Sequence, residues 1–254
     1  MRIRLDAALV ALGLLACQPH KTRVPADATL LYDVDFGAPE QALGKPLVVV
    51  PTGQEQQFPS RTPSQVFFGN PTVVAKLCGL GDQPLQLAVA HGQQGIEGVE
   101  FLLDQKQKHY HVELDLCIAT LGPAPIPAQK MQLAVFLDIA EAYAVAFLAS
   151  GEIGIVDPIL APETALDPRR IPVHWEANKP LRLGIDVDLD TQRWQVAVDG
   201  KQVFEGALRM TIPRAVRVVL RGNTSNEIAF DNLVIWGQKP IAADVPAPVT
   251  GEDQ

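Results

Sequence analysis

The stretch Leu181–Gly200 reads LRLGIDVDLDTQRWQVAVDG and carries the clearest structural signal in the chain. In its first half, isoleucine, valine and leucine alternate with three aspartates, the period-two pattern of a strand with one buried and one solvated face. Asp199-Gly200 follows, and Asp-Gly between alternating segments is a strong hairpin signal. The sequence here therefore predicts three consecutive antiparallel strands: Leu181–Leu189, Trp194–Val198 and Gln202–Glu205.

Short alternating runs of the same kind recur through most of the chain, with frequent turn residues between them. The cleanest is His109–Ile118 (HYHVELDLCI), in which every second residue is apolar. More than ten short strands with almost no helix predict an all-β fold, an antiparallel β-sandwich or jelly roll that follows a cleaved N-terminal signal peptide. The other expected strands are Leu30–Phe36, Val66–Phe68, Thr72–Leu77, Leu85–Ala90, Val99–Leu103, Gln132–Ile139, Tyr143–Ala149, Ile153–Val156, Val216–Leu220 and Glu227–Trp236.

One segment admits a second interpretation. Met131–Ala146 is rich in alanine and favours a helix by intrinsic propensity. Against this, Leu133, Val135 and Leu137 recur with a period of two, although the residues between them are mixed. We expect strands here.

The N-terminus has the order of an export signal. Arg2 and Arg4 precede a ten-residue apolar run, Ala7–Ala16, and Cys17 follows it. A charged start, an apolar stretch and small residues at the cleavage site are typical of a secretory signal peptide. Because a membrane-spanning helix needs roughly 20 apolar residues, this run is too short to be an anchor helix.

The residues Leu14-Leu15-Ala16-Cys17 resemble the lipobox of bacterial lipoproteins. The resemblance implies that Cys17 is acylated, with palmitate among the lipids, and that it becomes the mature N-terminus. The protein would then be lipid-anchored in the cell envelope, and Gln18, in place of Asp, favours the outer membrane, facing the periplasm or the cell surface. The alternatives are an ordinary cleaved signal and a buried N-terminal helix in which Cys17 is incidental.

These features divide the chain into four parts. Residues 1–16 are the signal peptide, and residues 17–29 are the lipidated cysteine and a flexible tether. Residues 30–237 form the sandwich domain. Residues 238–254 are rich in proline and acidic at the end, which is typical of a disordered tail.

Cysteine count and net charge agree with an exported protein. Cys78 and Cys117 remain once Cys17 is lipidated, and a pair in an exported chain suggests a disulfide; two separate buried thiols are the alternative. The net charge is −8, and residues 1–16 contribute +1, which leaves −9. An acidic domain lacks the basic surface that nucleic acid requires, and it is repelled by anionic lipid. We expect no nucleic-acid partner and membrane contact through the acyl chains alone.

The second half of the chain resembles a larger family. The opening LLYDVDFG, the stretch Leu181–Gly200 with the following KQVFEGAL, and Arg217–Trp236 (RVVLRGNTSNEIAFDNLVIW) are similar to concanavalin A-like lectin/glucanase (laminin G-like) jelly rolls. The resemblance implies two curved antiparallel sheets, with the first strand beside the last. It implies little about activity, because this fold hosts lectins, hydrolases, lyases and adhesion modules.

Enzymes of the laminarinase type on this fold use the pattern E-x-D-x-x-E on one strand. Glu113-Leu114-Asp115 begins that pattern, but Ile118 stands where the second glutamate is needed. Retaining glycoside hydrolysis requires two carboxyl groups that flank the scissile bond. The sequence therefore predicts no enzyme, and a solvated strand face explains the two acids.

His109, His111 and Glu113 lie two residues apart, so they share one face of their strand. Such groups are candidates for ligand binding or for zinc. Asp35 and Asp231, near the terminal strands, are weaker candidates for a structural Ca²⁺, as several proteins of similar fold hold one there. No other cofactor is expected.

The three tryptophans differ in their surroundings. Trp194 alternates in phase with valines and is expected in the core, while Trp236 ends the last strand. Trp175 falls in an expected loop and is the freest candidate for stacking on a sugar ring.

Three functions follow from these observations. The first is a non-catalytic envelope lipoprotein whose sandwich binds an envelope protein or serves as a scaffold. The second is a lipid-tethered carbohydrate-binding module. The third is a glycan-active enzyme whose site has no recognisable pattern.

Overall fold

The computed structural model describes residues 24–36, 41–50, 55–68, 70–75, 77–80, 84–88, 96–103, 106–120, 131–137, 143–148, 150–156, 168–208, 217–223 and 227–238. In these residues every regular element is a β-strand. The same residues contain no helix that is long and apolar enough to cross a membrane. The expected signal peptide and lipid site, most of the tether, and the tail beyond residue 238 lie outside the described residues.

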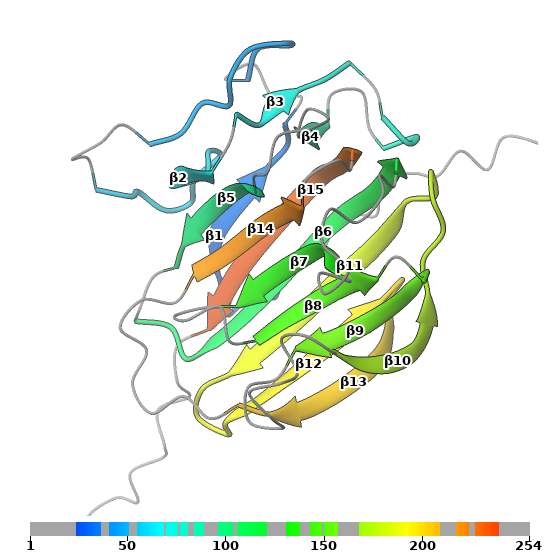
Figure 1. The fold of residues 1–254 in the computed structure, drawn as a ribbon. Helices are drawn as coiled ribbons and strands as arrows, with labels where there is room; N and C mark the ends of the chain where they lie inside the picture. Colours follow the sequence, from blue (N-terminus) through cyan, green and yellow to red (C-terminus); the bar gives the residue numbers. More distant parts are fainter. Residues whose placement is uncertain are drawn as a thin grey trace, which may run out of the picture.

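The strands form two sheets that pack face to face (Figure 1). The eight-stranded sheet has the order β13 (Lys201–Ala207), β12 (Arg193–Val198), β11 (Leu181–Asp188), β6 (His109–Thr120), β15 (Glu227–Gln238), β4 (Leu85–Ala88) and β3 (Thr72–Val73), and β1 (Thr29–Val34) also pairs with β15. The seven-stranded sheet has the order β10 (Arg169–His174), β9 (Glu152–Val156), β8 (Tyr143–Leu148), β7 (Met131–Leu137), β14 (Arg217–Asn223), β5 (Ile96–Leu102) and β2 (Gln65–Phe68). The predicted all-β antiparallel sandwich is confirmed.

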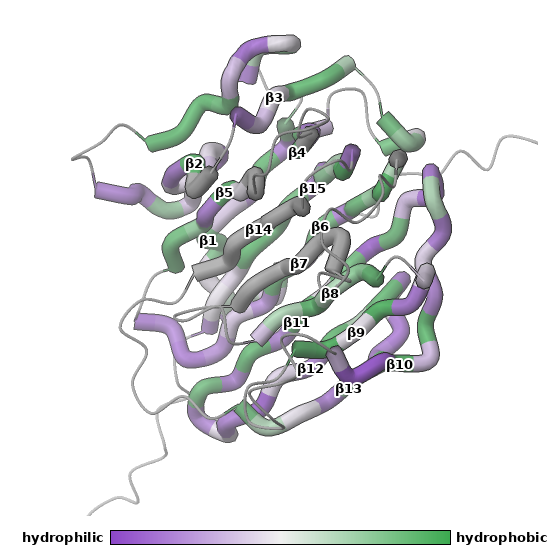
Figure 2. Tube along the Cα trace, viewed as in Figure 1, coloured by the Kyte–Doolittle hydropathy of each residue, from purple (hydrophilic) through white to green (hydrophobic). Residues whose placement is uncertain are grey.

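The core lies between the sheets and follows from the period-two pattern. In β6, Tyr110, Val112 and Leu114 are at most 1% exposed, whereas the residues between them are partly accessible. Hydrophobic and hydrophilic residues alternate in the same way along the neighbouring strands of this sheet (Figure 2). Because each strand buries one face, the opposite face of β11 and of the first part of β6 is left to polar side chains.

The predicted hairpin between β12 and β13 is confirmed. Val198 pairs with Lys201, and the two residues between them, Asp199 and Gly200, have φ angles of 50° and 75°. Both angles lie in the left-handed region, as a two-residue type I′ turn requires, and Gly and Asp enter that region at low cost.

Two segments test the secondary-structure predictions most sharply. Met131–Leu137 is a strand, as expected, and not part of a helix. β10 was not expected, because Arg169–His174 (RRIPVH) carries two arginines and a proline. Proline cannot donate to a neighbouring strand, but it is tolerated at a sheet edge. β10 is such an edge, since it pairs with β9 at the end of the sheet order.

The first and last strands lie side by side, as the resemblance implied. β1 pairs antiparallel with β15, and Thr29 lies opposite Gly237. The side chain of Gln238 also donates a hydrogen bond of 2.9 Å from Nε2 to Oδ2 of Asp27. The start of β1 and the end of β15 therefore sit at the same end of the sandwich.

Candidate functional site

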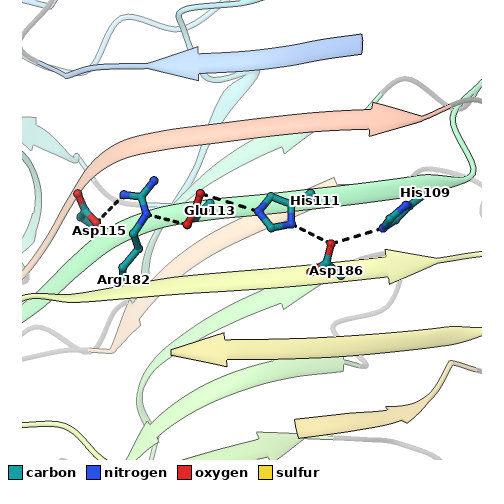
Figure 3. A network of polar contacts seen from close by, with 6 residues as sticks. All are labelled: His109, His111, Glu113, Asp115, Arg182 and Asp186. Atoms are coloured by element: carbon teal, nitrogen blue, oxygen red, sulfur yellow. Dashed lines mark hydrogen bonds and ion pairs between the residues drawn. The ribbon is translucent and has the colours of Figure 1, made fainter. Parts of the chain in front are cut away.

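Charged side chains gather on the outer face of the eight-stranded sheet, where β6 and β11 run side by side. The apolar residues of β6 point into the core, so the residues between them point outward. The register places Asp186 opposite His111 and Arg182 opposite Asp115, which brings β11 side chains to the same face. We call this group the ionic ladder, and Figure 3 shows its six members: His109, His111, Glu113, Asp115, Arg182 and Asp186.

One end of the ionic ladder is built around Asp186. Its Oδ1 lies 2.8 Å from Nδ1 of His111 and 3.4 Å from Nε2 of His109. Nε2 of His111 lies 3.9 Å from Oε2 of Glu113. Each histidine therefore contacts a carboxylate, and His111 contacts two.

The other end is built around Arg182. Its Nε donates to Oε1 of Glu113 and its Nη1 donates to Oδ1 of Asp115, both at 2.7 Å. Asn232 of β15 donates from Nδ2 to the second oxygen of Asp115 at 2.8 Å. Basic and acidic groups thus alternate along the face, and Arg182 and His111 each lie between two carboxylates.

The contacts shift the protonation of the ladder. Burial opposes protonation of His111, but its bonds to Asp186 and Glu113 outweigh burial and raise its pKa to about 9. The bond to Asp186 also raises the pKa of His109. Burial acts against ionisation of Asp186, yet the two histidines hold the pKa of its carboxyl well below the usual range. At neutral pH His111 is therefore a cation and Asp186 an anion.

The ionic ladder is partly accessible to solvent. Its side-chain exposures run from 15% for Arg182 to 36% for Asp186. The groups are thus reachable from outside, while their mutual contacts hold them in fixed positions. Fixed, half-buried polar groups are what a binding site needs, because little ordering remains to be done when a ligand arrives.

An aromatic ring lies beside the histidine end. Trp236 of β15 pairs with His111 in the register, and their rings stack with centroids 4.8 Å apart and an interplanar angle of 16°. His109 meets the same indole edge-on, at 5.7 Å and 70°. Nδ1 of His109 also lies 3.1 Å from Oε1 of Gln238. The last strand therefore contacts both histidines from the side of β6 that lies opposite β11.

The disulfide covers the same face beyond Asp115. Cys117 points outward from β6 and is bonded to Cys78, with their Cα atoms 6.1 Å apart, so the predicted disulfide is confirmed. Leu77, Leu80 and Ala229 pack around it in a small apolar cluster separate from the main core. The ionic ladder therefore ends, on the side of Arg182, at this apolar cluster around the disulfide.

The predicted ligand residues His109, His111 and Glu113 do share one face, but their atoms are engaged in ion pairs. Among the described residues, no three His, Cys, Asp or Glu side chains are placed to hold a metal ion together. The structure therefore favours an ionic network over the zinc site.

The two calcium candidates are placed differently. Asp35 is exposed just after β1, whereas Asp231 is 4% exposed in β15, where its Oδ1 accepts the backbone N–H of Asn232 at 2.8 Å. The structural Ca²⁺ stays a prediction.

The expectation that Trp175 is the most freely exposed tryptophan is wrong. It is 5% exposed, and its indole N–H donates to the carbonyl of Leu148 at 3.0 Å. Its backbone N–H bonds to Gly151, directly after the unexpected strand β10. Trp194, at 1% exposed, lies in the core as predicted.

Sequence reasoning did not assign Arg182, Asp186 or Trp236 to the site. The three aspartates of the first alternating stretch were expected to point to water, and Asp186 instead binds two histidines. Only the pairing register of β6 with β11 and β15 brings these residues together, and no local pattern encodes that register.

The ion pairs predict a pH dependence of stability. In the folded protein the pKa of His111 is raised to about 9. The stability that protonated His111 contributes is therefore fully present below about pH 6.5 and is lost as pH rises through 9. The pKa of Asp186 is lowered, so this residue affects stability at acidic pH. The stability that its carboxylate contributes is lost as pH falls below about 4. We expect urea unfolding to show a loss of about 1–2 kcal/mol between pH 6 and 9.5, discounted for partial exposure.

The control for this pH dependence is His111→Gln. This variant should be less stable than the wild type at pH 6 and should lose less stability on going to pH 9.5. An identical pH dependence in the variant would show that His111 is not the group responsible.

Comparison with known proteins yields structural likeness alone. No protein-family model matches the chain, and no curated protein matches it. Among solved structures, lectin II from Ulex europaeus is 12% identical, with 70% of this chain and 95% of that chain covered and a TM-score of 0.48. The carbohydrate recognition domain of Emp47p is 11% identical, with 83% and 97% covered and a TM-score of 0.49.

A sialidase also matches, at 14% identity and a TM-score of 0.45, but the match covers only 16% of the sialidase and 65% of this chain. At these identities and TM-scores, no residue role and no ligand carries over to this chain.

Proposed function

We propose that this protein is a non-catalytic carbohydrate-binding module that an N-terminal lipid holds at the bacterial cell envelope. The observation that supports it most directly is the ionic ladder. Six charged or titratable side chains lie partly exposed on one sheet face and are held by one another. Such a face offers hydrogen-bond donors and acceptors side by side in fixed positions.

The alternation of charge indicates the kind of ligand. Arg182 lies between Glu113 and Asp115, and His111 lies between Asp186 and Glu113. A charged ligand group gains little here, because it competes with a partner that is already in place. A hydroxyl both donates and accepts, so it can bind a carboxylate and a neighbouring cation together. Uncharged sugars present such hydroxyls in rows.

The same contacts argue against catalysis on this strand. Glu113 and Asp115 would be the acids of the E-x-D pattern, and Arg182 binds both. Ile118, at the position of the missing glutamate, is 1% exposed and belongs to the core. The second glutamate of the E-x-D-x-x-E pattern is therefore absent from β6, and the two acids that are present are both bound to Arg182.

The binding proposal is tested with the full chain, purified in detergent, on an array of neutral, acidic and amino-sugar glycans. We expect binding to neutral glycans. Arg182→Met should weaken it at least tenfold, since it removes the cation that positions Glu113 and Asp115. Binding to no glycan would overturn the proposed function.

The matched control for Arg182→Met is Arg193→Met. Arg193 lies on β12 and pairs with Glu205 outside the ionic ladder, with its side chain 64% exposed. This variant should bind as the wild type does, and circular dichroism should show that both variants are folded. Equal losses in the two variants would mean that the effect is not specific to the ladder.

The anchoring proposal rests on the sequence around Cys17 and has its own test. Mass spectrometry of the envelope fraction should find diacylglycerol on the Cys17 thiol, and Cys17→Ala should move the protein from the detergent phase to the aqueous phase. Recovery of the wild type in the aqueous phase would contradict a lipid anchor while leaving the binding proposal intact.

A further inference from the structure

The last strand carries one extra residue beside the ionic ladder. In the pairing of β15 with β6, Asp231 lies opposite Asp115 and Val234 lies opposite Glu113. Two residues of β15 therefore face one residue of β6, which makes a β-bulge, and Asn232 in this bulge has a φ angle of 50°. Bulges re-aim side chains and are frequent next to functional sites. Here the side chain brought beside Asp115 is that of Asn232.

The amide of Asn232 has one acceptor to spare. Its Nδ2 donates to Oδ2 of Asp115 at 2.8 Å, and because a carboxylate only accepts, this contact fixes which way the amide points. Its Oδ1 takes part in no hydrogen bond with a described residue, and this atom is not buried. Oδ1 is therefore an acceptor open to solvent on a side chain that Asp115 already holds in place.

An apolar surface lies next to this acceptor. Cys117 comes two residues after Asp115 on β6 and pairs with Ala229 of β15, in the apolar cluster around the disulfide. Two residues along a strand span about 7 Å. Leu77 and Cys78 pack against this cluster and are only partly buried, so the cluster has an accessible apolar edge. This end of the ionic ladder thus combines a fixed acceptor with a neighbouring apolar surface.

We infer that the Arg182 end of the ionic ladder recognises the acetamido group of N-acetylated sugars: Oδ1 of Asn232 accepts the amide N–H, and the methyl group packs on the apolar cluster around the disulfide. The inference rests on the proposed function and names the class of neutral glycan. A sugar hydroxyl in the same place would use the acceptor but would leave the apolar edge in water. An acetamido group uses both, and it is uncharged, so it adds no charge to a face whose charges already balance.

Two hexasaccharides with the same β-1,4-linked glucose skeleton provide the test. Chitohexaose carries an acetamido group at C2 of each ring, whereas cellohexaose carries a hydroxyl there. In calorimetric titrations of the full chain in detergent, chitohexaose should bind at least about fourfold more tightly, the factor expected from burying one methyl group. Failure of chitohexaose to bind, or equal affinity for the two sugars, overturns this inference while the proposed function stands on any other neutral glycan that binds.

Asn232→Gly removes the acceptor at a position where glycine adopts the left-handed conformation without strain. It should weaken binding of chitohexaose roughly 3- to 10-fold and reduce the preference over cellohexaose. An equal loss of affinity for both sugars would show that Asn232 only holds Asp115 in place, and it would overturn the inference.

The matched control is Gln192→Gly. This substitution also removes an amide side chain at a residue of positive φ, 54°, but Gln192 lies in the turn between β11 and β12, beyond the histidine end. The control should bind as the wild type does, and circular dichroism should show that both variants are folded. Wild-type affinity in Asn232→Gly, or the same loss in Gln192→Gly, contradicts the assigned role of Asn232. Absence of binding by every glycan, on the array and in these titrations, overturns the proposed function itself.

Discussion

Replacement of Trp194 by alanine is expected to lower the free energy of unfolding by about 3–5 kcal/mol, the usual cost of emptying a large aromatic site in a core. Trp194 lies on β12 and is 1% exposed. Its ring meets Phe204 of the same sheet at 5.0 Å and Tyr143 of the opposite sheet at 5.7 Å, both edge-on. The indole thus joins the two sheets, and its loss leaves a cavity that neither sheet can fill alone.

The measurement is urea unfolding followed by circular dichroism, and Trp194→Phe is the matched control. Phenylalanine keeps an aromatic ring, and no hydrogen bond is lost because the indole N–H has no partner among the described residues. We expect this control to cost about 1 kcal/mol. A loss of under 1 kcal/mol in Trp194→Ala would show that the ring does not hold the sheets together.

Removal of the disulfide is expected to cost about 4 kcal/mol, because Cys78 and Cys117 close a loop of 39 residues and restrict the unfolded chain. The double variant Cys78→Ser, Cys117→Ala tests this. Alanine is used at 117 because that side chain is fully buried and a serine hydroxyl there would need a partner.

A reductant breaks the disulfide without replacing either side chain, so it distinguishes the effect of the bond from the effect of the substitutions. Treatment of the wild type with dithiothreitol should lower its stability by a similar amount, and the double variant should not respond. If reduced and oxidised wild-type protein unfold at the same urea concentration, the bond contributes nothing to stability.

The fold could be predicted from the sequence where one face of a strand is buried. Alternation of apolar and polar residues predicted β6, β11 and β12, and the Asp199-Gly200 pair predicted the hairpin between β12 and β13. Both signals depend on neighbouring residues alone. β10 was missed because its arginines and proline suit an edge strand, which needs no regular apolar pattern. The misplacement of Trp175 followed directly, since this residue comes after β10 and folds back into the core.

The site could be predicted only in part, because sequence patterns report on residues that are close along the chain. The shared face of His109, His111 and Glu113 follows from spacing along one strand. Their partners Asp186 and Arg182 lie about 70 residues further along, and Trp236 lies further still. Which residues meet across strands depends on the register of the whole sheet, and a one-residue slip would replace every partner.

The pairing of Thr29 with Gly237 has a mechanical consequence. In an antiparallel pair the hydrogen bonds run perpendicular to the strands, so a pull between residues at the same end opens them one after another, like a zipper. The histidine end of the ionic ladder lies at this same end of the sheet, because Gly237 also pairs with Tyr110. Tension between Thr29 and a molecule held at the histidines would therefore also run across the strands. We therefore expect the β1–β15 pair to open at low force, one hydrogen bond after another, whether the domain is stretched between its own two ends or between Thr29 and the histidine end of the ionic ladder.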